Sequence, residues 1–185
     1  MLTDITLKLT LDMITDSNNN TAKSLVGHLG THFDVMDKEF PLDYTKRRGI
    51  VFDVSGVLAR DIEIADIDLD RVERDSFVAF YTGYCDREIY GTREYFSNHP
   101  QLSHELIDAL LSKEVSIIGV DFAGIRRGKE HVPVDQLCAD KNVFVIENLC
   151  NLKTVIDKGV VFIAHTYPMS CLGISGLPCR VIAEV

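Results

Sequence analysis

The sequence predicts a single α/β domain in which flanking helices cover a mixed β-sheet. Its 185 residues suit one ordinary domain. The first half is rich in strand-like segments, whereas the second half alternates helical and strand-like segments, and this mixture is typical of α/β folds. The chain is 46% hydrophobic and 25% charged, the profile of a soluble globular protein with enough apolar residues for a sizeable core.

The strands are predicted from alternation and from β-branched composition. Residues 5–11 alternate apolar and polar side chains, as a half-exposed strand does, and lead into the loop signal DSNNN at 16–20. Further segments are rich in Val, Ile and Phe, which are favoured in strands. They are residues 49–54, 76–82, 115–120, 143–146, 160–164 and 180–185.

Two helices are predicted in the second half. The first spans 103–114, with Ser103 as N-cap, Glu105 in the first turn and leucines on one face. The second is expected to start at Pro133, which suits the first helical position, and to carry Asp135 in its first turn. The strand-like runs VSIIGVD and NVFVIEN follow these helices at once, which indicates an α-β-α-β order.

The charge balance excludes several classes of partner. The chain has 19 basic and 28 acidic side chains, a net charge of −9, so we expect neither nucleic-acid nor membrane binding. No apolar run approaches the roughly 18 residues that span a bilayer, and the first residues lack a secretory signal. The five cysteines show no CxxC spacing and indicate reduced thiols and a cytoplasmic location.

The segment VGHLGTHFDV carries the clearest chemical signal. Two glycines and the β-branched Val and Thr disfavour a helix here. In an extended chain His28, His32 and Asp34 point to one side, and Gly30 permits a bend that brings His28 back towards the other two. Two imidazoles and a carboxylate suit Zn²⁺, and also Mn²⁺ or Fe²⁺. A set of surface polar groups, or a hydrogen-bonded turn, is the alternative.

Two other groups of residues suggest a site. Glu147 closes an apolar strand, so it either reaches water or needs a cation or proton, and His131 and Asp135 flank the junction before the second helix. Asp135 is also compatible with simple stabilisation of the helix N-terminus. Arg126 and Arg127 lie in a basic loop that either binds a substrate carboxylate or phosphate or is merely solvated.

Together these segments resemble the cyclase family, whose members include bacterial kynurenine formamidases and isatin hydrolases. The family signature is H-x-G-T-H-x-D-x-P-x-H, and residues 28–34, HLGTHFD, match its first half. Other segments along the chain resemble family motifs: YTG at 81–83, YFSNHPQLS at 95–103, GVD at 119–121 and IENL at 146–149. The resemblance implies a mixed α/β fold of the swivelling β/β/α type, and oligomers with sites close to subunit contacts.

The resemblance also implies a site. His28, His32 and Asp34 are expected to bind a metal, with Asp34 bridging to a second metal bound by Glu147. The family histidine twelve residues before that glutamate is Asp135 here, which leaves Asp135 or His131 as the second ligand. The family Pro is Met36, and its acid/base histidine is Lys38. Lys38 either donates a proton or stabilises an oxyanion, if its pKa is lowered, or is only a surface lysine.

Two functions follow from these residues. The first is an arylformamidase-like hydrolase of a small amide or cyclic amide that uses Zn²⁺ or Mn²⁺, with Lys38, Glu147 or His131 as proton carriers. The second is a catalytically altered relative that binds a small ligand or serves assembly, which the changes at Met36, Lys38 and Asp135 favour. In either case we expect a small-molecule partner and a homo-oligomer, a dimer or a tetramer.

Overall fold

The computed structural model describes residues 1–17, 27–171 and 173–185, and its frame is a closed barrel of seven strands. Strand β8 pairs with β7 on one edge and with β2 on the other, which closes the strand order β8-β2-β6-β5-β4-β3-β7 on itself. The barrel strands are β2 (His32–Asp34), β3 (Lys46–Asp53), β4 (Phe77–Tyr81), β5 (Ile117–Val120), β6 (Phe144–Glu147), β7 (Val161–Pro168) and β8 (Gly176–Glu184). The predicted α/β fold with a mixed sheet is confirmed.

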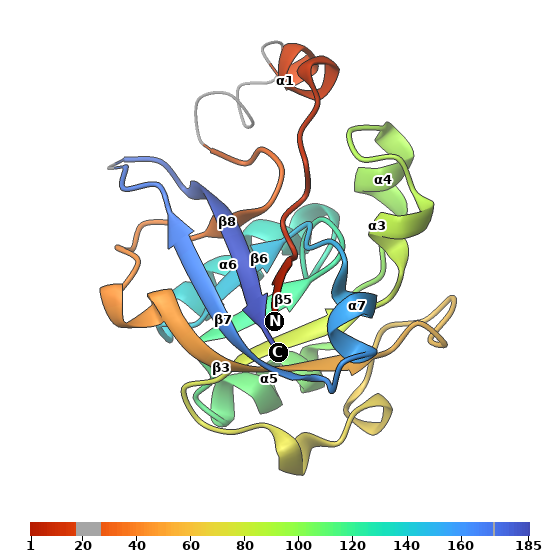
Figure 1. Ribbon diagram of the computed structural model, residues 1–185, viewed down its shortest axis with the longest axis vertical. Helices are drawn as coiled ribbons and strands as arrows, with labels where there is room; N and C mark the ends of the chain where they lie inside the picture. The colour runs from red at the N-terminus through yellow and green to blue at the C-terminus, as the bar shows by residue number, and fades with distance from the viewer. Residues whose placement is uncertain (18–26, 172) are drawn as a thin grey trace.

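Strand direction divides the barrel into two parts. Strands β3, β4, β5 and β6 are mutually parallel, so their carboxyl ends lie at one edge. Strands β2, β7 and β8 pair antiparallel to their neighbours. Strand β1 (Leu2–Asp4) extends the edge of β8 that also carries β2, and this pairing places the two termini side by side (Figure 1).

The two predicted helices are present. Helix α5 (His104–Ser112) begins after Ser103, whose hydroxyl accepts a hydrogen bond from the Leu106 amide. Helix α6 (His131–Asp140) begins two residues before the predicted start at Pro133. The shorter elements are α1 (Leu11–Ser17), α3 (Tyr84–Arg87), α4 (Arg93–Asn98), α7 (Leu152–Ile156), η1 (Leu42–Thr45), η2 (Ile64–Asp66), η3 (Leu69–Arg71) and η4 (Gly128–Glu130).

The predicted strand over residues 5–11 is wrong in its extent. The strand is Leu2–Asp4, Thr6 makes only an isolated bridge to Leu149, and Leu11 begins α1. The alternation of apolar and polar residues reflects the burial of Ile5, but the segment does not form a continuous run of strand pairing. Asp16 and Ser17 of the predicted loop belong to α1, and its residues 18–20 lie outside the described part of the chain.

The apolar side chains form two cores, because the parallel strands are buried on both faces. In β4, Phe77 and Ala79 pack inside the barrel, whereas Val78 and Phe80 pack with the outer core beneath α5 and α6. Gly119 of β5 is required inside the barrel, since a Cβ there would overlap the Phe77 ring. None of the helices in the described residues is long and apolar enough to cross a membrane.

Candidate metal centre

The bend predicted at Gly30 positions the first group of metal donors. Gly30 has φ +65, a left-handed conformation that favours glycine, and residues 27–31 precede β2 without forming a helix. His28 and Asp34 thereby come together: His28 Nδ1 lies 2.9 Å from Asp34 Oδ1 and 3.0 Å from His32 Nε2. Since His32 Nε2 also lies 3.6 Å from Asp34 Oδ1, the three predicted donors form one cluster.

A second group of donors adjoins the first and shares Asp34 with it. It consists of Asp34, His131, Asp135 and Glu147, and the potential ligand atoms within each group all lie within 4.8 Å of one another. His131 Nε2 lies 3.2 Å from Asp135 Oδ2 and 3.7 Å from Glu147 Oε1. His131 and Asp135 are four residues apart on α6, so they share a helix face. The structure therefore brings both proposed second ligands to one place, together with Glu147.

The hydrogen bonds of the histidines direct lone pairs into the centre. His32 Nδ1 lies 2.9 Å from the Gly30 carbonyl and His131 Nδ1 lies 3.2 Å from the Arg126 carbonyl. A carbonyl oxygen only accepts, so in both rings Nδ1 carries the proton and Nε2 is a free lone pair. His28 Nε2 lies 2.9 Å from Ser175 Oγ, which can accept its proton and leave Nδ1 as the third lone pair.

The carboxylates of the centre lack hydrogen-bond donors, which fits a bound cation. Among the described residues, five buried carboxylate oxygens accept no hydrogen bond: both of Asp34, both of Asp135 and Oε1 of Glu147. Burial, together with the nearby charges of Asp34 and Asp135, raises the pKa of Glu147 well above its usual range. Burial also raises the pKa of Asp135. For Asp34 burial acts in the same direction, but hydrogen bonds and positive charge from His28 and His32, which these rings supply only when protonated and without a metal, lower the pKa. Unpaired buried carboxylates facing lone-pair nitrogens are costly, and a divalent cation would satisfy both kinds of donor.

Lys38 does not have the environment that a proton donor needs. Its ammonium lies 2.8 Å from Asp140 and 3.3 Å from Asp37, and hydrogen bonds to these carboxylates raise its pKa. The chain also takes a different path here from one that a proline would allow, because Met36 has φ +56 and its amide donates to the Ser175 carbonyl. The predicted catalytic role of Lys38 therefore finds no support in these contacts.

The two arginines of the basic loop have different environments. Arg126 is 8% exposed, and its guanidinium donates to Asp61, to Glu130 and to the Leu102 carbonyl. These contacts hold the loop in place, so the prediction that Arg126 binds substrate is not supported. Arg127 is half-buried, and within the described part of the chain its side chain donates one long hydrogen bond, 3.4 Å to the Ser97 carbonyl.

Several residues that support the centre were not predicted from the sequence. The amide of Asn148 donates to the Gly30 carbonyl at 3.0 Å, and the Tyr95 hydroxyl donates to Asn148 Oδ1 at 2.8 Å. Asn148 directly follows Glu147 in the IENL segment, and this position beside a candidate ligand could have indicated its role. Ser175 gave no signal, because only the fold brings it to His28 from 147 residues away.

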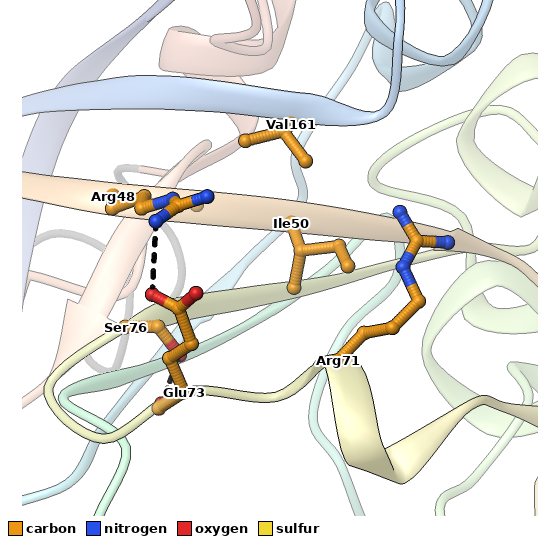
Figure 2. Close-up of a pocket in the computed structure, with 7 residues that line it drawn as sticks. Arg48, Ile50, Arg71, Glu73, Ser76 and Val161 are labelled. Atoms are coloured by element: carbon orange, nitrogen blue, oxygen red, sulfur yellow. Dashed lines mark hydrogen bonds and ion pairs between the residues drawn. The ribbon is translucent and has the colours of Figure 1, made fainter.

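Two of the cavities lined by described residues lie away from the metal donors. One, of about 290 Å³, is lined by residues of β3 and by Arg71, Glu73, Ser76 and Val161. Figure 2 shows an ion pair between Arg48 and Glu73 at one end of it and Arg71 on the other side of Ile50. The other cavity, of about 360 Å³, includes Thr82, Arg87, His99 and Arg127 in its lining.

The family model described as "Putative cyclase" matches residues 3–126, which is more than half of the chain. The chain belongs to the cyclase family. No curated protein matches it by sequence. The predicted family membership is thus confirmed, and the described structure places the signature residues of this cyclase-family chain in one cluster.

Solved structures share the fold of this cyclase-family chain. One is described as a potential metal-dependent hydrolase with cyclase activity. It has a TM-score of 0.75 and is 21% identical in sequence, and the match covers 99% of this chain and 96% of that one. Another is isatin hydrolase A from Labrenzia aggregata bound to benzyl benzoate, with a TM-score of 0.70 and 19% identity over 83% of this chain and 72% of that one. A third is an isatin hydrolase bound to thioisatinate, with a TM-score of 0.71 and 21% identity, over 85% of this chain and 72% of that one.

Proposed function

We propose that this protein is a metal-dependent hydrolase that cleaves a carbon–nitrogen bond in a small amide or cyclic amide. The observation that carries the proposal is the pair of adjoining donor groups that share Asp34, with unpaired carboxylate oxygens and histidine lone pairs directed into them. Family membership and the shared fold of hydrolases support it.

The two donor groups differ in the metal that suits them. His28, His32 and Asp34 offer two imidazoles and a carboxylate, a set that suits Zn²⁺. The group of Asp34, His131, Asp135 and Glu147 is richer in oxygen and suits a harder ion such as Mn²⁺. A divalent ion bound here would lower the pKa of a water molecule and polarise a carbonyl group.

Glu147 and His131 are the residues best placed to move a proton. Glu147 Oε1 accepts no hydrogen bond among the described residues and lies 3.7 Å from His131 Nε2. The side chain of His131 is 29% exposed, whereas that of Glu147 is 5% exposed. Nε2 is the only lone pair of His131, so His131 can take this role only where it does not bind the ion. A proton taken up at Glu147 Oε1 would then pass to the partly exposed His131 ring, from which the leaving nitrogen would be protonated.

A binding role without turnover is the second candidate. The contacts of Lys38 with Asp37 and Asp140 favour it, because the position of the family acid/base histidine is occupied here by a paired surface lysine. In this case the metal and a small ligand would bind, but no amide would be cleaved. We also propose, for either function, a small-molecule ligand, a homo-oligomeric state and a cytoplasmic location.

The test measures metal content and turnover on the same preparations. We expect one or two equivalents of Zn²⁺ or Mn²⁺ in the parent protein, loss of metal in His32→Ala, and full metal content in the control His165→Ala. His165 is a suitable control because it also lies beside a carboxylate, Glu184, but outside both donor groups. A parent that stays metal-free after incubation with both ions would defeat the metal centre.

Turnover separates the two candidates once the metal is bound. Isatin, named for two of the structural relatives, and simple formanilides are the first substrates to assay, by the absorbance change on ring opening or deformylation. The hydrolase proposal expects turnover that is lost in Glu147→Gln and kept in Lys38→Met. A fully metallated protein that binds these amides without cleaving them would support the binding role instead.

A further inference from the structure

The cavity of about 360 Å³ lies at the carboxyl ends of the parallel strands. Residues 57–61 follow β3, Thr82 and Arg87 follow β4, and Arg127 follows β5. The lining residues include no member of either metal donor group. Glu147 ends the next parallel strand, β6, so the cavity and the metal centre share one edge of the sheet, the edge at which α/β folds commonly bind ligands.

The uncompensated charge in this cavity is positive. Arg60 is neutralised by Asp66, which it contacts at 2.6 Å, and the cavity carboxylate Asp61 is bound by Arg126 at 2.6 Å. Arg87 and Arg127 form no ion pair with any described residue. Each donates one side-chain hydrogen bond to a backbone carbonyl, Arg87 to Thr82 at 3.0 Å and Arg127 to Ser97 at 3.4 Å. Two unpaired guanidinium groups in a protein of net charge −9 mark this cavity as a site for an anion.

His99 adds a hydrogen-bond acceptor to the same cavity. The ring is 2% exposed and stacks on Phe122 at 5.6 Å. Its Nδ1 lies 2.8 Å from the Pro100 carbonyl, which only accepts, so Nδ1 carries the proton. Burial lowers the pKa of His99 to about 4, and the charge of Arg127 contributes to this. At neutral pH Nε2 is therefore a lone pair, and no described residue donates a hydrogen bond to it.

We propose that this cavity binds a small oxyanion that carries its own hydroxyl group, such as hydrogen phosphate, a phosphate monoester or a 2-hydroxycarboxylate. The anionic oxygens would accept hydrogen bonds from Arg87 and Arg127, and the hydroxyl would donate to His99 Nε2. An oxyanion without a hydroxyl would offer no donor to His99 Nε2 and would bind more weakly. The site does not depend on the hydrolase reaction, since its residues are separate from the metal donors.

The test compares pairs of anions that differ in the hydroxyl. Metal-loaded, ¹⁵N-labelled protein is titrated at pH 7 with phosphate and sulfate, and separately with lactate and acetate, and amide shifts are followed. We expect saturable shifts at residues 82–87, 98–101 and 127, with the hydroxyl-bearing member of at least one pair binding about tenfold more tightly. A preference within the first pair indicates a phosphate group, and within the second a hydroxycarboxylate. Equal affinities within both pairs, or shifts confined to residues 28–34 and 147, would overturn the proposal.

Variants assign the effect to the cavity. Arg127→Gln should weaken binding of the preferred anion about tenfold, whereas Arg71→Gln should not change it. Arg71 is a matched control because it lines the other cavity (Figure 2) and likewise forms no ion pair within the described residues. His99→Phe keeps a ring against Phe122 and should abolish the preference for the hydroxyl while leaving some binding. An unchanged affinity in Arg127→Gln would refute the site even if His99→Phe fails to fold.

Discussion

Replacing Asn148 with alanine removes the side chain that links Tyr95 to the backbone around the metal centre. Asn148 Nδ2 donates to the Gly30 carbonyl at 3.0 Å, and the same carbonyl accepts the Nδ1 proton of His32 at 2.9 Å. That proton fixes Nε2 of His32 as the lone pair directed at Asp34 and Glu147. Groups that orient a metal ligand in this way affect metal affinity by 10- to 100-fold (order of magnitude). Because Asn148 acts one step away, through Gly30, we expect about a tenfold loss of Zn²⁺ affinity.

The same substitution also lowers stability. It leaves the Tyr95 hydroxyl, on a side chain that is 0% exposed, without its acceptor, which costs about 1–3 kcal/mol. Asn148 has φ +57, and alanine in this left-handed conformation costs about 1 kcal/mol more. We therefore expect the free energy of unfolding to fall by about 2–4 kcal/mol.

Asn151→Ala is the matched control for Asn148→Ala. Asn151 has φ +56 and also donates its amide to a backbone carbonyl, that of Asp4, but it is exposed and contacts no metal donor. Zn²⁺ affinity is measured by competition with a chromophoric chelator, and stability by urea unfolding of the metal-free protein. If Asn148→Ala folds and binds Zn²⁺ as tightly as Asn151→Ala does, the proposed link from Asn148 to His32 is refuted.

Three further predictions concern a turn, a surface pair and a buried ring. Gly30→Ala should destabilise the protein by about 1–3 kcal/mol and reduce its zinc content. The reason is that Gly30 has φ +65 and that a Cβ there would lie 3.0 Å from the Leu9 side chain. Unfolding curves measure the first effect and metal analysis the second. Lys38→Met should leave both metal content and stability nearly unchanged, since exposed ion pairs contribute little. The pKa of His99 is near 6.5 in the unfolded chain and about 4 in the folded protein, so the unfolded chain takes up the proton first as the pH falls. The free energy of unfolding should therefore decrease by about 3 kcal/mol between pH 6.5 and pH 4. Urea unfolding at several pH values checks this: the difference in the free energy of unfolding between parent and His99→Phe should fall with this loss. Burial raises the pKa of Asp121 to about 6, so protonation of Asp121 acts in the opposite direction, but it does so equally in both proteins and cancels in the difference.

Local residue types explain what could be predicted of the site. The glycines and β-branched residues around His28 and His32 exclude a helix, and Gly30 permits the bend that joins them to Asp34. Ser103 predicted the start of α5 because its hydroxyl can accept from the first helical turn. These features depend on neighbours in the sequence, so a single chain reveals them.

Long-range contacts explain what could not be predicted. Arg126 and Arg127 look alike in the sequence. Asp61, 65 residues from Arg126, forms an ion pair with Arg126, whereas no described residue forms one with Arg127. The role of His131 depends on where α6 begins. A helix starting at Pro133 would leave His131 in the loop, whereas the observed start at His131 places it on the face of Asp135.

The pairing of β2 has a consequence for when the metal centre can form during synthesis. Within β2, His32 lies opposite Glu147 of β6 on one side and opposite Pro178 of β8 on the other. A ribosome delivers residues 28–34 more than a hundred residues before Glu147, and Ser175 and β8 follow later still. The first donor group is therefore synthesised early, but Glu147 of the second group and Ser175, which contacts His28, follow only later, so the two groups are complete together only after β8 has been made.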